Sequence, residues 1–174
     1  MVFTPIREVY PDAVRILSDG SSYWCYVSCY NPLLKSFGYE KLLQVDDDDY
    51  QGDSRVLFRD GDRFGILIFG WGSCSGCDAL QGCENYEEID ELRDELHNHI
   101  RWGNAAETLD YLRNHDWEGG FCWHAEETRK FVVQAIEMMA RGGGGAGEGM
   151  GDRAVSGSQL VVRQNPARGN RNDA

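Results

Sequence analysis

The sequence carries little positive charge and no long hydrophobic run. Seventeen lysine and arginine residues stand against 29 acidic residues, which gives a formal net charge of -12. A chain of this charge repels the phosphates of nucleic acids, so direct binding of DNA or RNA is disfavoured. No stretch approaches the roughly 18 consecutive apolar residues that a transmembrane helix needs, so no membrane partner is expected.

The first residues, MVFTPIREVYPD, also lack the basic segment and the apolar core of a signal peptide. We therefore expect a cytoplasmic protein in which the six cysteines are reduced. In that compartment, closely spaced cysteines indicate metal binding or catalysis more often than a disulfide framework. The P-loop pattern and the HExxH pattern are both missing, so the chain shows no familiar signature of nucleotide binding or of a metalloprotease.

Charge and composition divide the chain near residue 140. Residues 1–140 contain 12 basic and 26 acidic residues, whereas residues 141–174 contain five arginines, three acidic residues and nine glycines. A segment of the second kind cannot bury enough apolar surface to offset the loss of chain entropy. The sequence therefore predicts one domain over residues 1–140 and a disordered, flexible Gly/Arg-rich tail over residues 141–174.

Two apolar runs predict a β-hairpin. Residues 55–58 and 64–69 flank an Asp60–Gly61 pair, which is a strong turn signal between apolar segments. The second run is apolar at nearly every position, and this predicts a central strand that is covered on both faces.

Helices are expected on the C-terminal side of this hairpin. Asn85 followed by Glu88 fits a capping box, and so does Asn104 followed by Glu107. The expected helices span residues 86–102, 105–114 and 125–140. We therefore predict an α+β fold in which a small antiparallel sheet, built on the 55–69 hairpin, packs against several helices.

The most distinctive segment is GWGSCSGC at residues 70–77, which is followed by Cys83. Buried cysteines often pack as small hydrophobes and glycines serve tight turns, so an inert packing loop is one interpretation. The second interpretation is a zinc site, because a C-x2-C pair supplies two thiolates from one turn. The zinc ligands would be Cys74, Cys77, Cys83 and, in the fourth position, Cys122 or His124.

Two further interpretations make one cysteine reactive. Cys74-Ser-Gly-Cys77 matches a C-x-x-C redox pair. The pattern G-x-C-x-G around Cys74 matches a nucleophile elbow, with His99 or His124 as the base. Both interpretations need a parallel βαβ setting, whereas this segment follows a predicted hairpin. The sequence therefore assigns no catalytic residue, and it leaves a packing turn and a zinc knuckle as the main alternatives.

Four consecutive aspartates, Asp46 to Asp49, invite a calcium interpretation. If Asp47 is position 1 of an EF-hand loop, position 12 is Phe58, where such a loop needs a bidentate glutamate. A strand is also expected after this loop, where an EF-hand has a helix. The sequence therefore favours a solvated acidic turn, with weak cation binding as the alternative.

Three segments resemble small proteins that are carried by actinobacteria and their phages: GWGSCSGCDALQGC, EEIDELRDEL and NHDWEGG. The resemblance covers roughly residues 64–140 and is most specific at the GSCSGCDAL motif. No activity is established for that group, so the resemblance carries over no catalytic residue. Small phage accessory proteins often bind host factors, and the resemblance therefore favours a binding role.

We expect a small acidic cytosolic protein of the binding or regulatory kind, which acts through contacts with a protein partner and is not an enzyme. This expectation includes no cofactor. The alternative is a zinc-binding protein, a thiol enzyme or a redox protein centred on Cys74 and Cys77, with zinc as the possible cofactor. Bound zinc or one unusually reactive thiol would favour the alternative.

Overall fold

The structure is a computed structural model, and it describes residues 3–9, 27–72, 78–117 and 124–142. Its strands are β1 (Glu40–Asp46), β2 (Gly52–Asp60), β3 (Arg63–Trp71) and β4 (Arg101–Asn104). Its helices are α1 (Ile6–Val9), the 3-10 helix η1 (Val27–Tyr30), α3 (Asn31–Ser36), α4 (Ala79–Gly82), α5 (Tyr86–Asn98), α6 (Ala105–Asn114) and α7 (Ala125–Gly142). Within the described ranges, no helix has the length and the apolar character needed to cross a membrane. Of the predicted tail, only the first two residues are described, and they continue α7.

The four strands form one antiparallel sheet in the order β1-β2-β3-β4. β2 and β3 pair along their whole length, from the Gly52–Trp71 pair to the Asp60–Arg63 pair. Gly61 closes this hairpin with a φ of 62°, a left-handed conformation that glycine adopts without strain. The predicted hairpin and the predicted α+β fold are confirmed, and the hairpin is longer than its apolar runs indicate.

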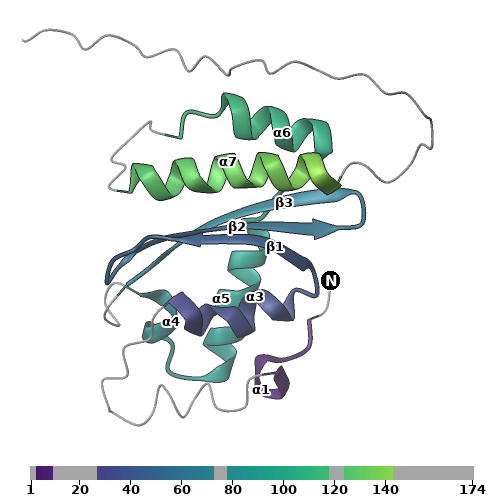
Figure 1. Ribbon diagram of the computed structural model, residues 1–174. Coiled ribbons are helices and arrows are strands. Elements are labelled where there is room, and N and C mark those ends of the chain that lie inside the picture. Colours follow the sequence, from purple (N-terminus) through teal and green to yellow (C-terminus); the bar gives the residue numbers. More distant parts are fainter. Residues whose placement is uncertain (1–2, 10–26, 73–77, 118–123, 143–174) are drawn as a thin grey trace, which may run out of the picture.

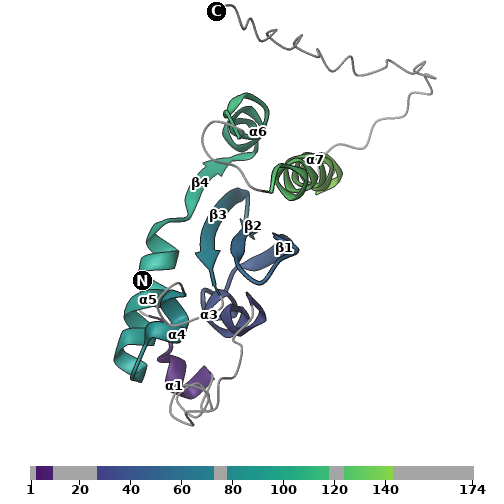
Figure 2. The ribbon, with the colours of Figure 1, turned by 90° about the vertical axis from the view of Figure 1, so that its left-hand side faces the viewer.

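Helices lie on both sides of the sheet (Figures 1 and 2). We call the side under α6 and α7 the α7 face, and the side that packs against α1, α3, α4 and α5 the α5 face. Successive side chains of a strand point to opposite sides. Leu67 and Phe69 of β3 accordingly pack on the α5 face, whereas Phe64 and Ile66 pack on the α7 face. The prediction of a central strand covered on both faces is confirmed.

Asparagine side chains start two helices, as predicted. Asn85 caps α5 and Asn104 caps α6, and each side-chain oxygen accepts the N–H of the glutamate three residues later. Helix α5 nevertheless ends at Asn98, four residues earlier than predicted. The residues after it, 101–104, leave the helix because they pair with β3 as the edge strand β4.

Candidate functional site

The turn between β1 and β2 holds a buried carboxylate. The side chain of Asp47 is 1% exposed, although its neighbours Asp48 and Asp49 are exposed. Its N–H donates to the carbonyl oxygen of Asp53 over 3.0 Å, and its Oδ2 accepts the N–H of Asp53 over 2.7 Å. Gly52 permits this packing, because a Cβ at Gly52 would lie 2.6 Å from Oδ2 of Asp47. The expected solvated acidic turn is therefore wrong at Asp47.

Arg55 of β2 pairs with the other oxygen of this carboxylate. Its Nη1 lies 2.6 Å from Oδ1 of Asp47, and its side chain is 5% exposed. Its Nη2 lies 3.9 Å from Oδ2 of Asp53. Burial raises the pKa of Asp53; Arg55 opposes this shift, Asp47 adds to it, and His124 opposes it. The side chains therefore form one coupled group of charges.

His124 and Glu127 add an imidazole and a third carboxylate at the same place. It precedes α7 directly, and its carbonyl oxygen accepts the N–H of Thr128 over 3.2 Å and the Thr128 hydroxyl over 3.0 Å. Its Nε2 lies 3.9 Å from Oδ2 of Asp47, and its Nδ1 lies 4.0 Å from Oε2 of Glu127. One ligand atom from each of these three residues can be chosen so that all three atoms lie within 4.8 Å of one another. We call Asp47, Asp53, Arg55, His124 and Glu127 the Asp47 cluster.

The predicted cysteine site falls mostly outside the described residues, since Cys74, Cys77 and Cys122 are not among them. Cys83 is described: it is buried after α4, and its thiol donates to the carbonyl oxygen of Ala79 over 3.3 Å. Burial raises the pKa of this thiol to about 11, and neighbouring carboxylates add to the shift. A thiol that stays protonated is a poor nucleophile near neutral pH.

His99 and His124 are the candidate bases predicted for Cys74, which lies outside the described residues, so that pairing stays a prediction. His99 is exposed and ends α5. His124 lies at the start of α7, whereas Cys83 packs in the hydrophobic cluster on the α5 face. The structure thus associates His124 with the carboxylates of the Asp47 cluster. Cys29 is disulfide-bonded, so the expectation that all six cysteines are reduced is wrong at this position.

The two ends of the cysteine segment are held together by Asp78 and Gln81. Oδ2 of Asp78 accepts the N–H of Gly72 over 2.8 Å, and its Oδ1 accepts the Tyr30 hydroxyl over 3.1 Å. Gln81 donates its N–H to Oδ1 of Asp78 over 2.9 Å and its Nε2 to the Gly72 carbonyl over 3.0 Å. Asp78 is therefore the N-cap of α4. These bonds fix where the segment begins and ends, while residues 73–77 lie outside the described residues.

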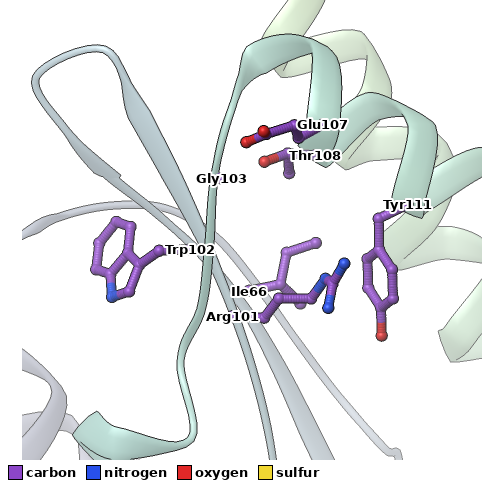
Figure 3. A pocket seen from close by; sticks show the side chains of 7 residues that line it. All are labelled: Ile66, Arg101, Trp102, Gly103, Glu107, Thr108 and Tyr111. Carbon is purple, nitrogen blue, oxygen red and sulfur yellow. The ribbon is translucent and has the colours of Figure 1, made fainter.

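A groove of about 350 Å³ lies between β4 and α6 (Figure 3). We call it the β4 groove, and its lining residues are Ile66, Arg101, Trp102, Gly103, Glu107, Thr108 and Tyr111. The guanidinium carbon of Arg101 lies 4.2 Å from the centre of the Tyr111 ring, which is a cation–π contact. A Cβ at Gly103 would lie 3.1 Å from Oγ1 of Thr108, so the glycine keeps this part of the groove open.

Trp102 points to the other side of β4 (Figure 3). Its ring centre lies 5.1 Å from the guanidinium carbon of Arg63 and 4.7 Å from the centre of the Tyr39 ring. Strand β4 therefore takes part in one arginine–aromatic pair on each side: Arg101 contacts Tyr111 of α6, and Trp102 contacts Arg63 of β3.

Comparison of the chain with protein-family models, with curated proteins and with solved structures found no match. The fold defines an α+β protein in which an antiparallel sheet is covered by helices on both faces.

The sequence indicates His124 as a candidate metal ligand, but it does not indicate which residues lie near His124 in space. A partial signal exists, because His124 and Glu127 are three residues apart at a helix start and so share one side of the helix. No local signal connects them with Asp47.

Proposed function

We propose that this protein is a small binding or regulatory protein that acts through contacts with a protein partner at the β4 groove. The observation that carries this proposal is the position of β4 at the edge of the sheet. Within the described residues, no strand pairs with its outer edge. The backbone N–H and C=O groups of such an edge can bind an extended segment of another chain as an additional strand.

The side chains around this edge support the same role. Arginine, tyrosine and tryptophan are the residue types that most often dominate the energy of protein interfaces. Arg101 and Tyr111 line the groove on one side of β4, and Trp102 with Arg63 lies on the other. Because Arg101 already rests on the Tyr111 ring, it loses little further freedom when it donates to carbonyl or carboxylate oxygens of the partner segment.

Site-specific photocrosslinking tests this location. A photoreactive amino acid at position 101 should form an adduct with a partner in the cells that contain the protein. The same amino acid at Glu91, an exposed position on α5, should not form that adduct. Adducts of equal yield at both positions, or none at position 101, would contradict the proposal.

The identified partner then allows a binding measurement. Arg101→Ala should weaken the complex about tenfold, which corresponds to about 1.4 kcal/mol. The matched control is Arg113→Ala, which removes an exposed arginine from α6 outside the groove and should leave the affinity unchanged. A double variant, Cys74→Ser with Cys77→Ser, separates this proposal from zinc or thiol chemistry, because the partner should still bind. Loss of the partner in that double variant, with binding retained in Arg101→Ala, would favour the cysteine alternative.

A further inference from the structure

The Asp47 cluster contains side chains that can bind a metal ion, and the proposed partner contact at the β4 groove does not involve them. We propose that Asp47, His124 and Glu127 bind a divalent transition-metal ion of the zinc class. One imidazole nitrogen and two carboxylate oxygens are ligands that zinc, manganese and iron accept, whereas calcium and magnesium prefer oxygen alone. This site lies at the start of α7 and shares no residue with the β4 groove.

The geometry is close to that of a bound ion. Zinc bonds to histidine nitrogen and carboxylate oxygen are about 2.0–2.2 Å long, so ligand atoms in a tetrahedron lie about 3.4 Å apart. Nε2 of His124 and Oδ2 of Asp47 are already 3.9 Å apart, and the three ligand atoms are all within 4.8 Å of one another. The side chains of His124 and Glu127 are each 23% exposed, so they have room for the small rotation that closes the remaining distance.

The surrounding residues hold the first ligand in place. Oδ1 of Asp47 is bonded to Arg55 and Oδ2 to the N–H of Asp53, which fixes the orientation of the carboxylate. A carboxylate oxygen has two lone pairs, so Oδ2 keeps one for an ion. Such supporting bonds commonly orient metal ligands and tune their affinity. His124 and Glu127 come from one helical turn, and α7 therefore presents them together.

The charge of the cluster favours a cation. The cluster contains three carboxylates and one guanidinium: Arg55 pairs with Asp47 and Asp53, and Glu127 lies beside His124. With a neutral imidazole the cluster carries two net negative charges, which one divalent ion balances. The N-terminus of α7 contributes the opposite sign, but a helix terminus amounts to only about half a unit charge. The negative side chains therefore outweigh it.

The ring nitrogens of His124 lie at distances from carboxylates that suit a bound metal ion. Both of its ring nitrogens face a carboxylate, at 3.9 and 4.0 Å. These distances exceed those of a hydrogen bond, which for N–H···O is about 2.7–3.2 Å. An ion between His124 and Asp47 would fill this gap. Three protein ligands would leave a fourth position for water or for a group of another molecule, as in zinc sites that react or exchange ligands.

Titration of the full-length protein with Zn²⁺ tests the proposal. The metal-free protein should bind one Zn²⁺ in competition with a chromophoric chelator, and His124→Ala and Glu127→Gln should each weaken binding at least about tenfold. Matched controls are His99→Ala and Glu126→Gln, which alter an exposed histidine and an exposed carboxylate outside the site. Both controls should bind Zn²⁺ like the unaltered protein. Circular dichroism should show all four variants folded.

Variants of the cysteines test the competing possibility that Zn²⁺ binds at the cysteine segment. A triple variant with Cys74, Cys77 and Cys122 replaced by serine should retain the Zn²⁺ affinity, and bound Co²⁺ should show no sulfur-to-metal charge-transfer band. Absence of Zn²⁺ binding, equal binding in His124→Ala, or loss of binding in the triple variant would each overturn the proposal. Loss of Zn²⁺ binding in the serine variant alone would instead assign the ion to the cysteine segment.

Discussion

Each face of the sheet has a buried arginine, and the two arginines differ in the side chains that surround them. On the α5 face, Nη1 of Arg93 donates to the carbonyl oxygen of Thr4 over 2.9 Å and pairs with Asp90 over 2.7 Å. Its Nη2 pairs with Asp94 over 2.7 Å, and Asp90 also accepts the N–H of Ile6 over 3.0 Å. These bonds join the N-terminal segment to α5, and the role of Arg93 is structural.

On the α7 face, Arg55 also pairs with two carboxylates, those of Asp47 and Asp53. Here, however, further side chains join the arginine and its two partners. His124 and Glu127 add a third carboxylate and an imidazole whose nitrogens lie 3.9 and 4.0 Å from their acidic neighbours. The contrast shows that a buried arginine alone does not mark a functional site. The excess of negative charge and the histidine distinguish the proposed metal site from the surroundings of Arg93, and four predictions follow from that distinction in order of expected effect.

The largest effect is expected for Asp47→Ala. This change leaves Arg55 buried without its 2.6 Å partner, and breaking a buried pair in this way costs about 3–5 kcal/mol. Urea unfolding should show the loss. Asp94→Ala is the matched change on the other face, and since Asp94 is 55% exposed it should cost less than about 1 kcal/mol. Similar losses in the two variants would remove the distinction between the faces.

Zinc should stabilise the protein through the Asp47 cluster on the α7 face, and the surroundings of Arg93 on the α5 face should not matter for this effect. At a free Zn²⁺ concentration of about 100 times Kd, the free energy of unfolding should rise by about 2.7 kcal/mol. Thermal unfolding with Zn²⁺ and with a chelator would measure this difference. The variant Arg93→Ala should keep the same response to Zn²⁺, whereas His124→Ala should lose it.

Arg93→Ala should destabilise the protein by about 2 kcal/mol, in line with the 1.5–3 kcal/mol of a hydrogen bond to a charged group. The loss should be local, because Arg93 joins the N-terminal segment to α5. Amide hydrogen exchange should therefore accelerate at Ile6 more than at Leu67 in the sheet. Equal acceleration at both residues would show that Arg93 supports the whole domain.

The smallest effect concerns alkaline pH on the α5 face. The pKa of Cys83 rises to about 11 in the folded protein from an ordinary value of 9.0. The folded state therefore holds the thiol proton more tightly, and this contribution is complete below pH 9 and lost as the pH rises through 11. Urea unfolding between these pH values should show a shallower decline for Cys83→Ala than for the unaltered protein. A parallel decline would mean that Cys83 does not contribute.

Local signals predicted the elements that depend on near neighbours. Three such elements are present: the Asp60–Gly61 turn and the caps at Asn85 and Asn104. Each depends on residues that are only a few positions apart in the sequence. Strand β4 depends on a distant partner: Trp102 pairs with Gly65, and a Cβ at Gly65 would lie 2.9 Å from the Trp102 ring. The sequence therefore predicted a longer α5 where the fold forms an edge strand.

The Asp47 cluster could not be predicted for a related reason. The aspartate run is typical of a solvated turn, and two of its members, Asp48 and Asp49, are indeed exposed. Asp47 is buried because Arg55 pairs with it across the strand turn and because α7 brings His124 to it. Burial of a charge is thus decided by the tertiary arrangement, which composition does not reveal.

The bonds at Gly72 and Asp78 have a consequence for how this protein can diversify. Gly72 and Asp78, which flank residues 73–77, are joined by a 2.8 Å hydrogen bond. These bonds use the backbone of Gly72 and the side chains of Asp78 and Gln81, which follow the segment. A sequence change confined to residues 73–77 therefore removes none of the groups that make these bonds, and the bonds offer a fixed reference at both ends of an exchanged segment.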